Sequence, residues 1–175
     1  KISNREVRLQ RGLEAGLTAV RLDQDDPFAH VGLGRVRIIR GEHDQAVLSF
    51  DHAIDLNPSF AIAYYGKAHS LWHCGKPDEA VKNHDKAIRL SPSDPLMWTF
   101  LASKAIALVM LERYDEALEC SIRSQQYPIT AIWAFMGQLS ALGHLGKTDE
   151  ASDALAHALD KEPELSIEFI ERALP

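Results

Sequence analysis

The most constraining feature of the sequence is an amphipathic stretch that occurs in four copies. The first copy, at residues 41–58, is GEHDQAVLSFDHAIDLNP, and the others lie at residues 75–92, 112–128 and 146–163. Each copy has apolar residues at helical spacing and ends at a proline, which cannot continue a helix. The pattern predicts a helix in every copy, so one structural unit is repeated along the chain.

Two small positions in each copy give the repeat its register. The first position is occupied by Ala46, Ala80, Ala117 and Ala151, which are separated by 34, 37 and 34 residues. The second lies seven residues later and is occupied by Ala53, Ala87, Ser124 and Ala158. Seven residues are two helical turns, so both positions lie on one helix face, where small side chains let two helices approach closely. A period near 34 residues with paired helices is typical of a solenoid.

The starts of the predicted helices are also marked. An aspartate precedes each first alanine by two residues, and a carboxylate there stabilises a helix N-terminus. Gly41, Gly75 and Gly146 are expected to adopt a left-handed backbone in interhelix turns. Upstream, Asn4 is expected to cap a helix ending near Leu22, in which glycines allow close packing, and Asp26-Pro27 is expected to start the next helix.

Composition excludes several classes of function. The formal net charge of −6 provides no basic field for nucleic-acid phosphates, so nucleic-acid binding is not expected. The longest apolar run, residues 105–111, is far shorter than the roughly 20 residues of a membrane helix, so no membrane span is expected. Two cysteines without a secretory signal favour a reduced, cytoplasmic setting. The absence of an initial methionine favours a fragment of a longer protein.

The repeated unit resembles the tetratricopeptide repeat (TPR). The residues that carry this resemblance in the first repeat are Leu33, Gly34, Ala46, Phe50, Ala53 and Pro58. The resemblance implies an all-α, right-handed superhelical solenoid of antiparallel helix pairs. The third repeat departs from the pattern because it has three extra residues, no turn glycine, and serines where an aromatic residue and alanine are expected. Its first helix is predicted at residues 95–111, about one turn longer than in the other repeats.

The repeat pattern also predicts the division of the chain. An N-terminal helix at residues 1–26 would be the second half of a partial repeat. Four repeats would follow at residues 27–60, 61–94, 95–131 and 132–163. Residues 164–175 would form a helix that caps the open end of the array.

The resemblance implies a partner-binding groove lined by the first helix of each repeat. The positions that match the groove are Phe28, Val31, Arg35, Ile38, Ile39, Ile62, Tyr65, His69, Trp72, His73, Val109, Met110, Trp133, Met136 and His144. They are mostly apolar or aromatic, and Arg35 is the only fixed cation among them. The cationic set with which the family's chaperone-tail clamp grips terminal carboxylates is absent, so an apolar segment is the expected ligand. The alternative is that some of these side chains pack against helices of the same chain.

No catalytic motif or cofactor site is evident in the sequence. The Asp-Glu pairs recur at equivalent helix starts and are interpreted as helix-terminal charges. His69 and His73 have the spacing of two zinc ligands on one helix face, but no HExxH or paired CxxC motif supplies the others, so we predict no metal site. Cys74 and Cys120 are interpreted as small, buried or half-buried apolar residues.

The expected function is therefore a non-catalytic module that binds a protein or peptide partner. The strings DLNPS and RLSPSDP resemble TPR regions of bacterial multidomain adenylate or guanylate cyclases and transcriptional regulators. That resemblance implies a larger regulatory or signalling protein. Two alternatives remain open: self-association that joins copies of a signalling enzyme, and a metal-dependent role of His69 and His73.

Overall fold

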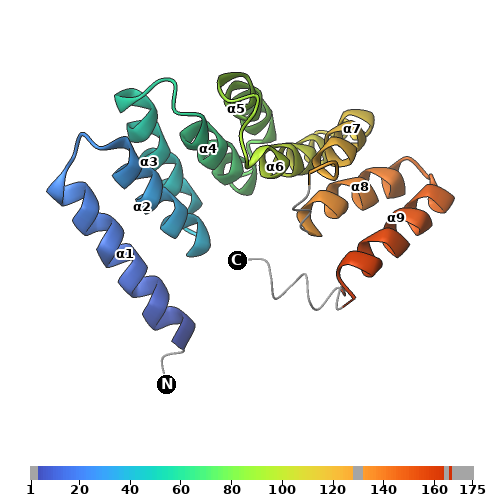
Figure 1. Ribbon diagram of the computed structural model, residues 1–175, viewed down its shortest axis with the longest axis horizontal. Coiled ribbons are helices and arrows are strands. Elements are labelled where there is room, and N and C mark those ends of the chain that lie inside the picture. Colours follow the sequence, from blue (N-terminus) through green and yellow to red (C-terminus); the bar gives the residue numbers. More distant parts are fainter. Residues whose placement is uncertain (1–3, 128–131, 164–165, 167–175) are drawn as a thin grey trace. The chain divides into compact units, whose positions relative to one another are not determined.

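The computed structural model describes residues 4–127, 132–163 and 166, and all regular secondary structure in these residues is helical (Figure 1). The N-terminal helices are α1 (Asn4–Leu22), α2 (Pro27–Ile39), α3 (His43–Leu56), α4 (Ala61–His73) and α5 (Pro77–Leu90). The C-terminal helices are α6 (Met97–Met110), α7 (Tyr114–Ser124), α8 (Ile132–His144) and α9 (Thr148–Lys161). The predicted all-α fold is confirmed.

The chain divides into two compact units, Lys1–Ser91 and Pro92–Leu174. In the N-terminal unit each helix packs against the next, and α2 also contacts α4. In the C-terminal unit α6 contacts α7 and α8, while α8 also contacts α7 and α9. Successive helices form hairpins, α2–α3 and α4–α5 in the first unit and α6–α7 and α8–α9 in the second (Figure 1).

Helix starts and ends follow the predicted signals. Asp26 caps α2 by accepting a hydrogen bond from the backbone N–H of Phe28 at 2.9 Å, and Pro27 occupies the first turn. Asp44 and its counterparts in α5, α7 and α9 lie in the first turn of their helices. The prolines at 58, 92 and 163 each follow the last helical residue by two positions. The capping helix predicted at residues 164–175 lies outside the described residues, apart from Ser166.

The turns within the hairpins share a left-handed residue. Gly41, Gly75 and Gly146 have φ of 74°, 72° and 68°, which confirms the expectation for the glycines. Glu112 takes the same role in the α6–α7 turn with a φ of 59°. A left-handed conformation brings the Cβ close to the following carbonyl oxygen, so Glu112 is strained where glycine is not.

The third repeat accommodates its extra residues differently from the prediction. Helix α6 has 14 residues and α4 has 13, so α6 is longer by one residue and not by one turn. The remaining extra length lies in the connection before α6, residues 91–96, which is longer than the equivalent connection at residues 57–60. Asp94 shapes this connection by accepting a hydrogen bond from the backbone N–H of Leu96 at 2.8 Å.

The core of the N-terminal unit centres on the ring of Phe50, which is fully buried. A Cβ atom placed on Gly34 of α2 would lie 2.7 Å from this ring, and one on Gly66 of α4 would lie 2.3 Å from it. Both distances are too short for a carbon contact, so the ring occupies space that only glycine leaves open on these two helices. Ala46 and Ala53 of α3, also fully buried, complete the same cluster.

Gly16 of α1 allows the close approach that the sequence predicts, because a Cβ atom there would lie only 3.2 Å from the Cα of Leu33 in α2. A Cβ atom on Gly12 would lie 3.5 Å from Val36, which is an ordinary contact. The cost of glycine in a helix interior, roughly 1 kcal/mol, is offset by packing against α2 at Gly16.

We expect Gly66→Ala to destabilise the N-terminal unit by about 1–3 kcal/mol, because the added methyl group overlaps the Phe50 ring. Gly32→Ala is the matched control, since a Cβ there meets nothing within 4 Å and alanine favours a helix. Urea unfolding should show a lower free energy for Gly66→Ala and an unchanged or higher one for Gly32→Ala. Equal effects of the two substitutions would contradict the packing described for Phe50.

We expect Glu112→Gly to stabilise the C-terminal unit by up to about 1 kcal/mol, because glycine relieves the strain of a left-handed backbone. The reverse change, Gly75→Ala, should destabilise the N-terminal unit by about 1 kcal/mol, although no atom lies within 4 Å of the new Cβ. Thermal or urea unfolding measures both changes. A lower stability of Glu112→Gly would contradict this expectation, because it would mean that the Glu112 side chain stabilises the fold by more than the strain of its left-handed backbone destabilises it.

Candidate functional site

The N-terminal unit has a pocket between α2 and α4, with a volume of about 190 Å³. We call it the α2–α4 pocket. Its lining residues are Arg35, Ile38, Ile39, Phe50, Ile62, Tyr65, Gly66 and His69. The volume is below the roughly 300 Å³ of the smallest typical small-molecule pockets, so the α2–α4 pocket has the size for a side chain of a larger partner.

The α2–α4 pocket exists because α2 and α4, the first helices of two successive repeats, lie side by side and both pack on α3. Glycine at 34 and 66 lets the Phe50 ring fit between them, and the same ring forms part of the pocket wall. Ile38 and Ile62 pack partly against the core cluster, which fixes the apolar walls. Arg35 is exposed at this pocket and makes no hydrogen bond or ion pair with any described residue.

The structure brings together six of the predicted groove residues at this pocket: Arg35, Ile38, Ile39, Ile62, Tyr65 and His69. Of these, Ile39 is half exposed. Val31 is a correction, because only 6% of it is exposed and it packs in the core with Ala46 and Phe50. Phe28 is exposed, but its ring packs edge-to-face on Phe60 at 4.6 Å and does not line the pocket.

The predicted groove residues of the C-terminal unit do not gather at one place in that unit. Val109 and Met110 end α6, with Val109 half-buried and Met110 exposed. Trp133 and Met136 are half-buried on α8. His144, exposed at the end of α8, stacks on Tyr114 with ring centroids 4.7 Å apart. The role of these residues in binding stays a prediction.

An aromatic stack lies at the C-terminal end of α4, next to the pocket. The ring of His73 lies between two partners: His43 of α3 at 4.0 Å and Trp72 at 3.7 Å, measured between ring centroids. His69 is 5.2 Å from His73 and 5.3 Å from Trp72. We call His43, His69 and His73 the histidine cluster. The sequence placed His69 and His73 on one face, as observed, but it gave no indication that His43 joins them.

The histidine cluster favours neutral rings. The pKa of His69 is lowered to about 3, first because burial disfavours the charged ring and then because His73 and His43 would repel the charge. The pKa of His73 is lowered to about 4 by burial and then by His43. Burial also lowers the pKa of His43, an effect that Asp44 opposes. The described part of the chain contains no group of three or more His, Cys, Asp or Glu side chains arranged for a metal ion.

Sequence reasoning missed Phe50 and Gly66 as pocket residues. Phe50 was assigned to packing alone, and its dual role follows only from the position of its ring between two helices. Gly66 had a usable signal, because a glycine inside an alanine-rich helix costs stability and marks a close approach. The cysteines behave as predicted: Cys74 is half-buried, Cys120 is buried, and both are free thiols.

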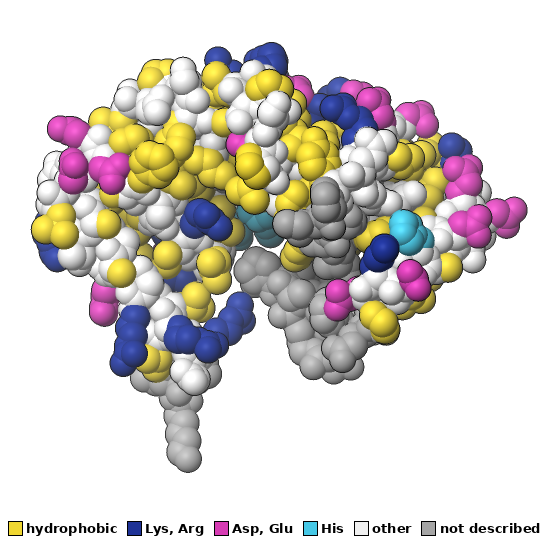
Figure 2. Space-filling model, viewed as in Figure 1, with side chains coloured by type: hydrophobic (Ala, Val, Ile, Leu, Met, Phe, Trp, Pro, Cys, Tyr) yellow, Lys and Arg dark blue, Asp and Glu magenta, His cyan; other side chains and the backbone are white. Residues whose placement is uncertain are grey.

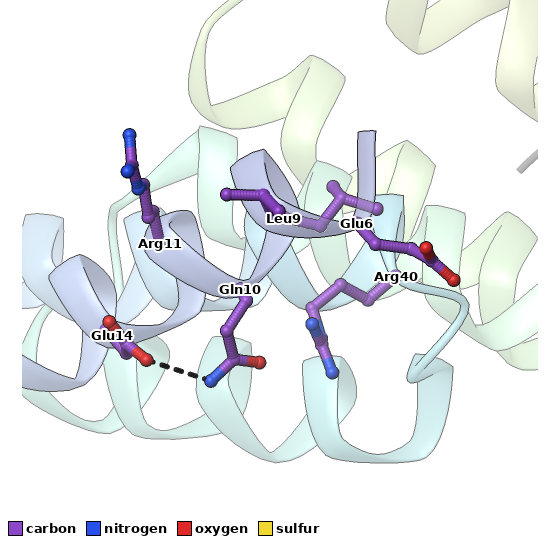
Figure 3. A pocket seen from close by; sticks show the side chains of 7 residues that line it. Glu6, Leu9, Gln10, Arg11, Glu14 and Arg40 are labelled. Atoms are coloured by element: carbon purple, nitrogen blue, oxygen red, sulfur yellow. Dashed lines mark hydrogen bonds between the residues drawn. The ribbon is translucent and has the colours of Figure 1, made fainter. Parts of the chain in front are cut away.

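A larger and more open cavity, of about 680 Å³, lies along the N-terminal half of α1 (Figure 3). Its lining residues are Glu6, Val7, Leu9, Gln10, Arg11, Glu14 and Arg40. Gln10 donates a hydrogen bond to Glu14 at 3.0 Å, and Arg11 points away from this pair. Its walls come almost entirely from one helix, so this cavity is an open surface and the α2–α4 pocket is the better-formed site.

We expect acid to destabilise the N-terminal unit through His69. Because its folded pKa of about 3 lies below the ordinary 6.5, the neutral ring contributes stability above pH 6.5, and this contribution is lost as the pH falls towards 3. The loss reaches at most about 1.4 kcal/mol per pH unit for one histidine. Urea unfolding between pH 7 and pH 5 should therefore show a shallower pH dependence in His69→Gln than in the wild type. His52→Gln removes an exposed imidazole outside the cluster and serves as the control. An equal pH dependence of the free energy of unfolding in the wild type and in His69→Gln would refute the prediction.

Comparisons with solved structures support the fold. Similar structures include the TPR protein YrrB, described as having an unusual peptide-binding site, with a TM-score of 0.69 and 23% identity over 86% of this chain and 76% of that chain. TTC0263, a thermophilic TPR protein of Thermus thermophilus, has a TM-score of 0.76 and 17% identity over 90% and 84% of the two chains. MamA from Desulfovibrio magneticus has a TM-score of 0.74 and 16% identity over 93% and 90%. At these identities the likeness shows the all-α TPR solenoid fold alone.

The family is shown by a sequence model. No curated protein matches the chain. The tetratricopeptide repeat model matches twice, at residues 31–95 and 65–120. The two matches overlap and together span more than half of the 175 residues. The chain therefore belongs to the tetratricopeptide repeat family.

Proposed function

We propose that this chain is a non-catalytic interaction module that holds a peptide segment of a partner protein at the α2–α4 pocket. TPR proteins are protein-interaction modules, and the family model that matches this chain is that of the tetratricopeptide repeat. The observation that carries the proposal is the combination of an apolar pocket with a cation, Arg35, that no described residue neutralises. Such a site offers one apolar and one charged contact to a ligand.

The apolar contact is supported by the lining of the pocket. Ile38, Ile39 and Ile62 form walls that are only partly covered by the chain's own core. Removing an apolar side chain from water into this space contributes about 25 cal/mol per Å² of buried apolar area. The ligand is therefore a segment with a leucine, isoleucine or phenylalanine that enters the α2–α4 pocket.

The charged contact is supported by Arg35. A guanidinium group pairs with a carboxylate through two parallel hydrogen bonds, which also orients the ligand. One aspartate or glutamate close to the apolar residue satisfies this geometry. His69, at the same pocket, adds no second positive charge at neutral pH because its pKa is about 3. A tail with several carboxylates is thus a poorer match than a mainly apolar segment with one.

We place this module within a larger bacterial regulatory or signalling protein. Support comes from the strings DLNPS and RLSPSDP, which resemble TPR regions of cyclases and transcriptional regulators. Two free thiols support a cytoplasmic location. None of the described helices has the length and apolarity that a membrane span requires. The full coding sequence tests this context, and the absence of any regulatory or signalling domain from it would overturn the proposal.

The ligand class is tested by selecting binders from a random peptide display library on the immobilised 175-residue chain. We expect enriched peptides to share a large apolar residue with an aspartate or glutamate within about one helical turn of it. Enrichment of basic peptides, or of peptides without an apolar residue, would overturn the proposal.

An enriched peptide should then bind the variants of the α2–α4 pocket more weakly. Arg35→Glu should lower affinity at least about tenfold, since it replaces attraction by repulsion, and Ile39→Ser should lower it about three- to tenfold. Leu48→Ser on α3 is the matched control, because Leu48 is 54% exposed and Ile39 51%, but only Ile39 lines the pocket. Fluorescence anisotropy of a labelled peptide measures all three. Affinity unchanged in both pocket variants would locate the peptide elsewhere.

A further inference from the structure

The buried residues of the α2–α4 pocket lie at its base. Phe50 has no exposed surface and Gly66 is buried, while the other lining residues are half-buried or exposed. Figure 2 shows hydrophobic side chains gathered where α2 and α4 lie, and Ile38, Ile39 and Ile62 are the aliphatic walls of the pocket. A ligand side chain that enters between these isoleucines meets the Phe50 ring last, so this ring limits the depth of the pocket.

The surrounding residues hold the Phe50 ring in place. Cβ atoms placed on Gly34 and Gly66 would lie only 2.7 Å and 2.3 Å from ring atoms, so the ring touches the backbones of both α2 and α4. Ala46 and Ala53 of its own helix, both fully buried, complete the same cluster. In a densely packed interior, displacing an aromatic side chain forces neighbouring side chains and backbone to shift, which is destabilising. The base of the pocket is therefore fixed and does not adapt to a larger ligand.

The equivalent position in the C-terminal unit has a small residue and a different result. Ser121 is the counterpart of Phe50 in the repeat register. A Cβ atom on Gly137 of α8 would lie 2.6 Å from Ser121 Oγ and 2.9 Å from the Cβ of Ala105 in α6. Helices α6 and α8 thus meet each other directly, whereas in the N-terminal unit the aromatic ring contacts both first helices. The comparison indicates that the side chain at this position sets the space between two successive first helices.

We propose that Phe50 determines the specificity of the α2–α4 pocket, by limiting the ligand side chain that enters it to about the size of a phenyl ring. This inference rests on the peptide binding proposed above. The pocket volume of about 190 Å³ is somewhat larger than a protein cavity of roughly 150 Å³ that holds benzene. A leucine, isoleucine or phenylalanine side chain fits this space, whereas the larger indole of tryptophan would have to displace the fixed ring.

Substitution of Phe50 should change which side chain the pocket prefers. Phe50→Leu deepens the pocket, so a tryptophan anchor gains room while a leucine anchor leaves a gap beneath it. Apolar pockets discriminate side chains that differ by one methylene by about tenfold or more, so the ratio of the two affinities should change at least about tenfold. Phe50→Met, which is flexible and closer in volume, should shift the ratio in the same direction with a smaller loss of stability.

Fluorescence anisotropy measures this ratio with two versions of an enriched display peptide. The anchor is the apolar peptide residue whose change to alanine weakens binding most, and the two versions have leucine or tryptophan there. The wild-type chain should bind the leucine version at least about tenfold more tightly. Phe100→Leu is the matched control, because Phe100 of α6 is fully buried and does not line the pocket, so the ratio should keep its wild-type value. Circular dichroism verifies that each variant is folded.

Equal binding of the two peptide versions by the wild type would overturn the proposal. The same ratio in Phe50→Leu and in Phe100→Leu would also overturn it, because the pocket variant would then act only through general destabilisation.

A second measurement tests the pocket without a peptide. Toluene and methylindole reproduce the side chains of phenylalanine and tryptophan, and each is added to the chain with isotope-labelled isoleucine methyl groups. In NMR spectra toluene should shift the methyl signals of Ile38 and Ile62 in the wild type, and methylindole should shift them only in Phe50→Leu. If this selectivity is seen but no peptide binds, the proposed peptide binding fails and the role of Phe50 stands. Equal shifts by both compounds in the wild type, or no shift by either compound in either protein, would overturn the role of Phe50.

Discussion

The ring of Phe50 fills space that Gly34 and Gly66 leave open, and three helices of the N-terminal unit depend on this contact for their spacing. Because α2 and α4 both contact α3 this closely, they also lie close enough together to share a pocket. The same aromatic residue therefore stabilises the fold and shapes the candidate site. Stability and binding are linked here, since an interior defect at Phe50 would also deform the wall that a ligand touches.

Much of the architecture could be predicted because the same sequence pattern occurs in four copies. Ala46 and Ala53 have counterparts in every copy, so their burial and the hairpin geometry follow from spacing alone. The caps and turn glycines depend on local backbone chemistry, which sequence shows directly. The third repeat shows where this reasoning fails. Three extra residues can lengthen a helix or a loop, and the spacing does not distinguish the two. In the structure the loop before α6 takes most of them.

The candidate site was harder to predict because it depends on distances between helices. Alignment assigned Arg35 and Tyr65 to the partner-binding groove, and both line the α2–α4 pocket. It also placed Val31 in the groove, although that side chain points into the core. His43 was missed because it starts a different helix, and no periodicity connects it to His73. The burial of a side chain and its contacts with other helices depend on the tertiary structure, and an alignment of the repeats does not show them.

The stack of His73 between His43 and Trp72 has a practical consequence for studying the N-terminal unit. Trp72 is the only one of the three tryptophans that lies within Lys1–Ser91, since Trp98 and Trp133 belong to the other unit. Its indole lies 3.7 Å from an imidazole and beside the α2–α4 pocket residue His69. A chain in which only this tryptophan remains would carry an intrinsic optical reporter of its first half, requiring no attached dye.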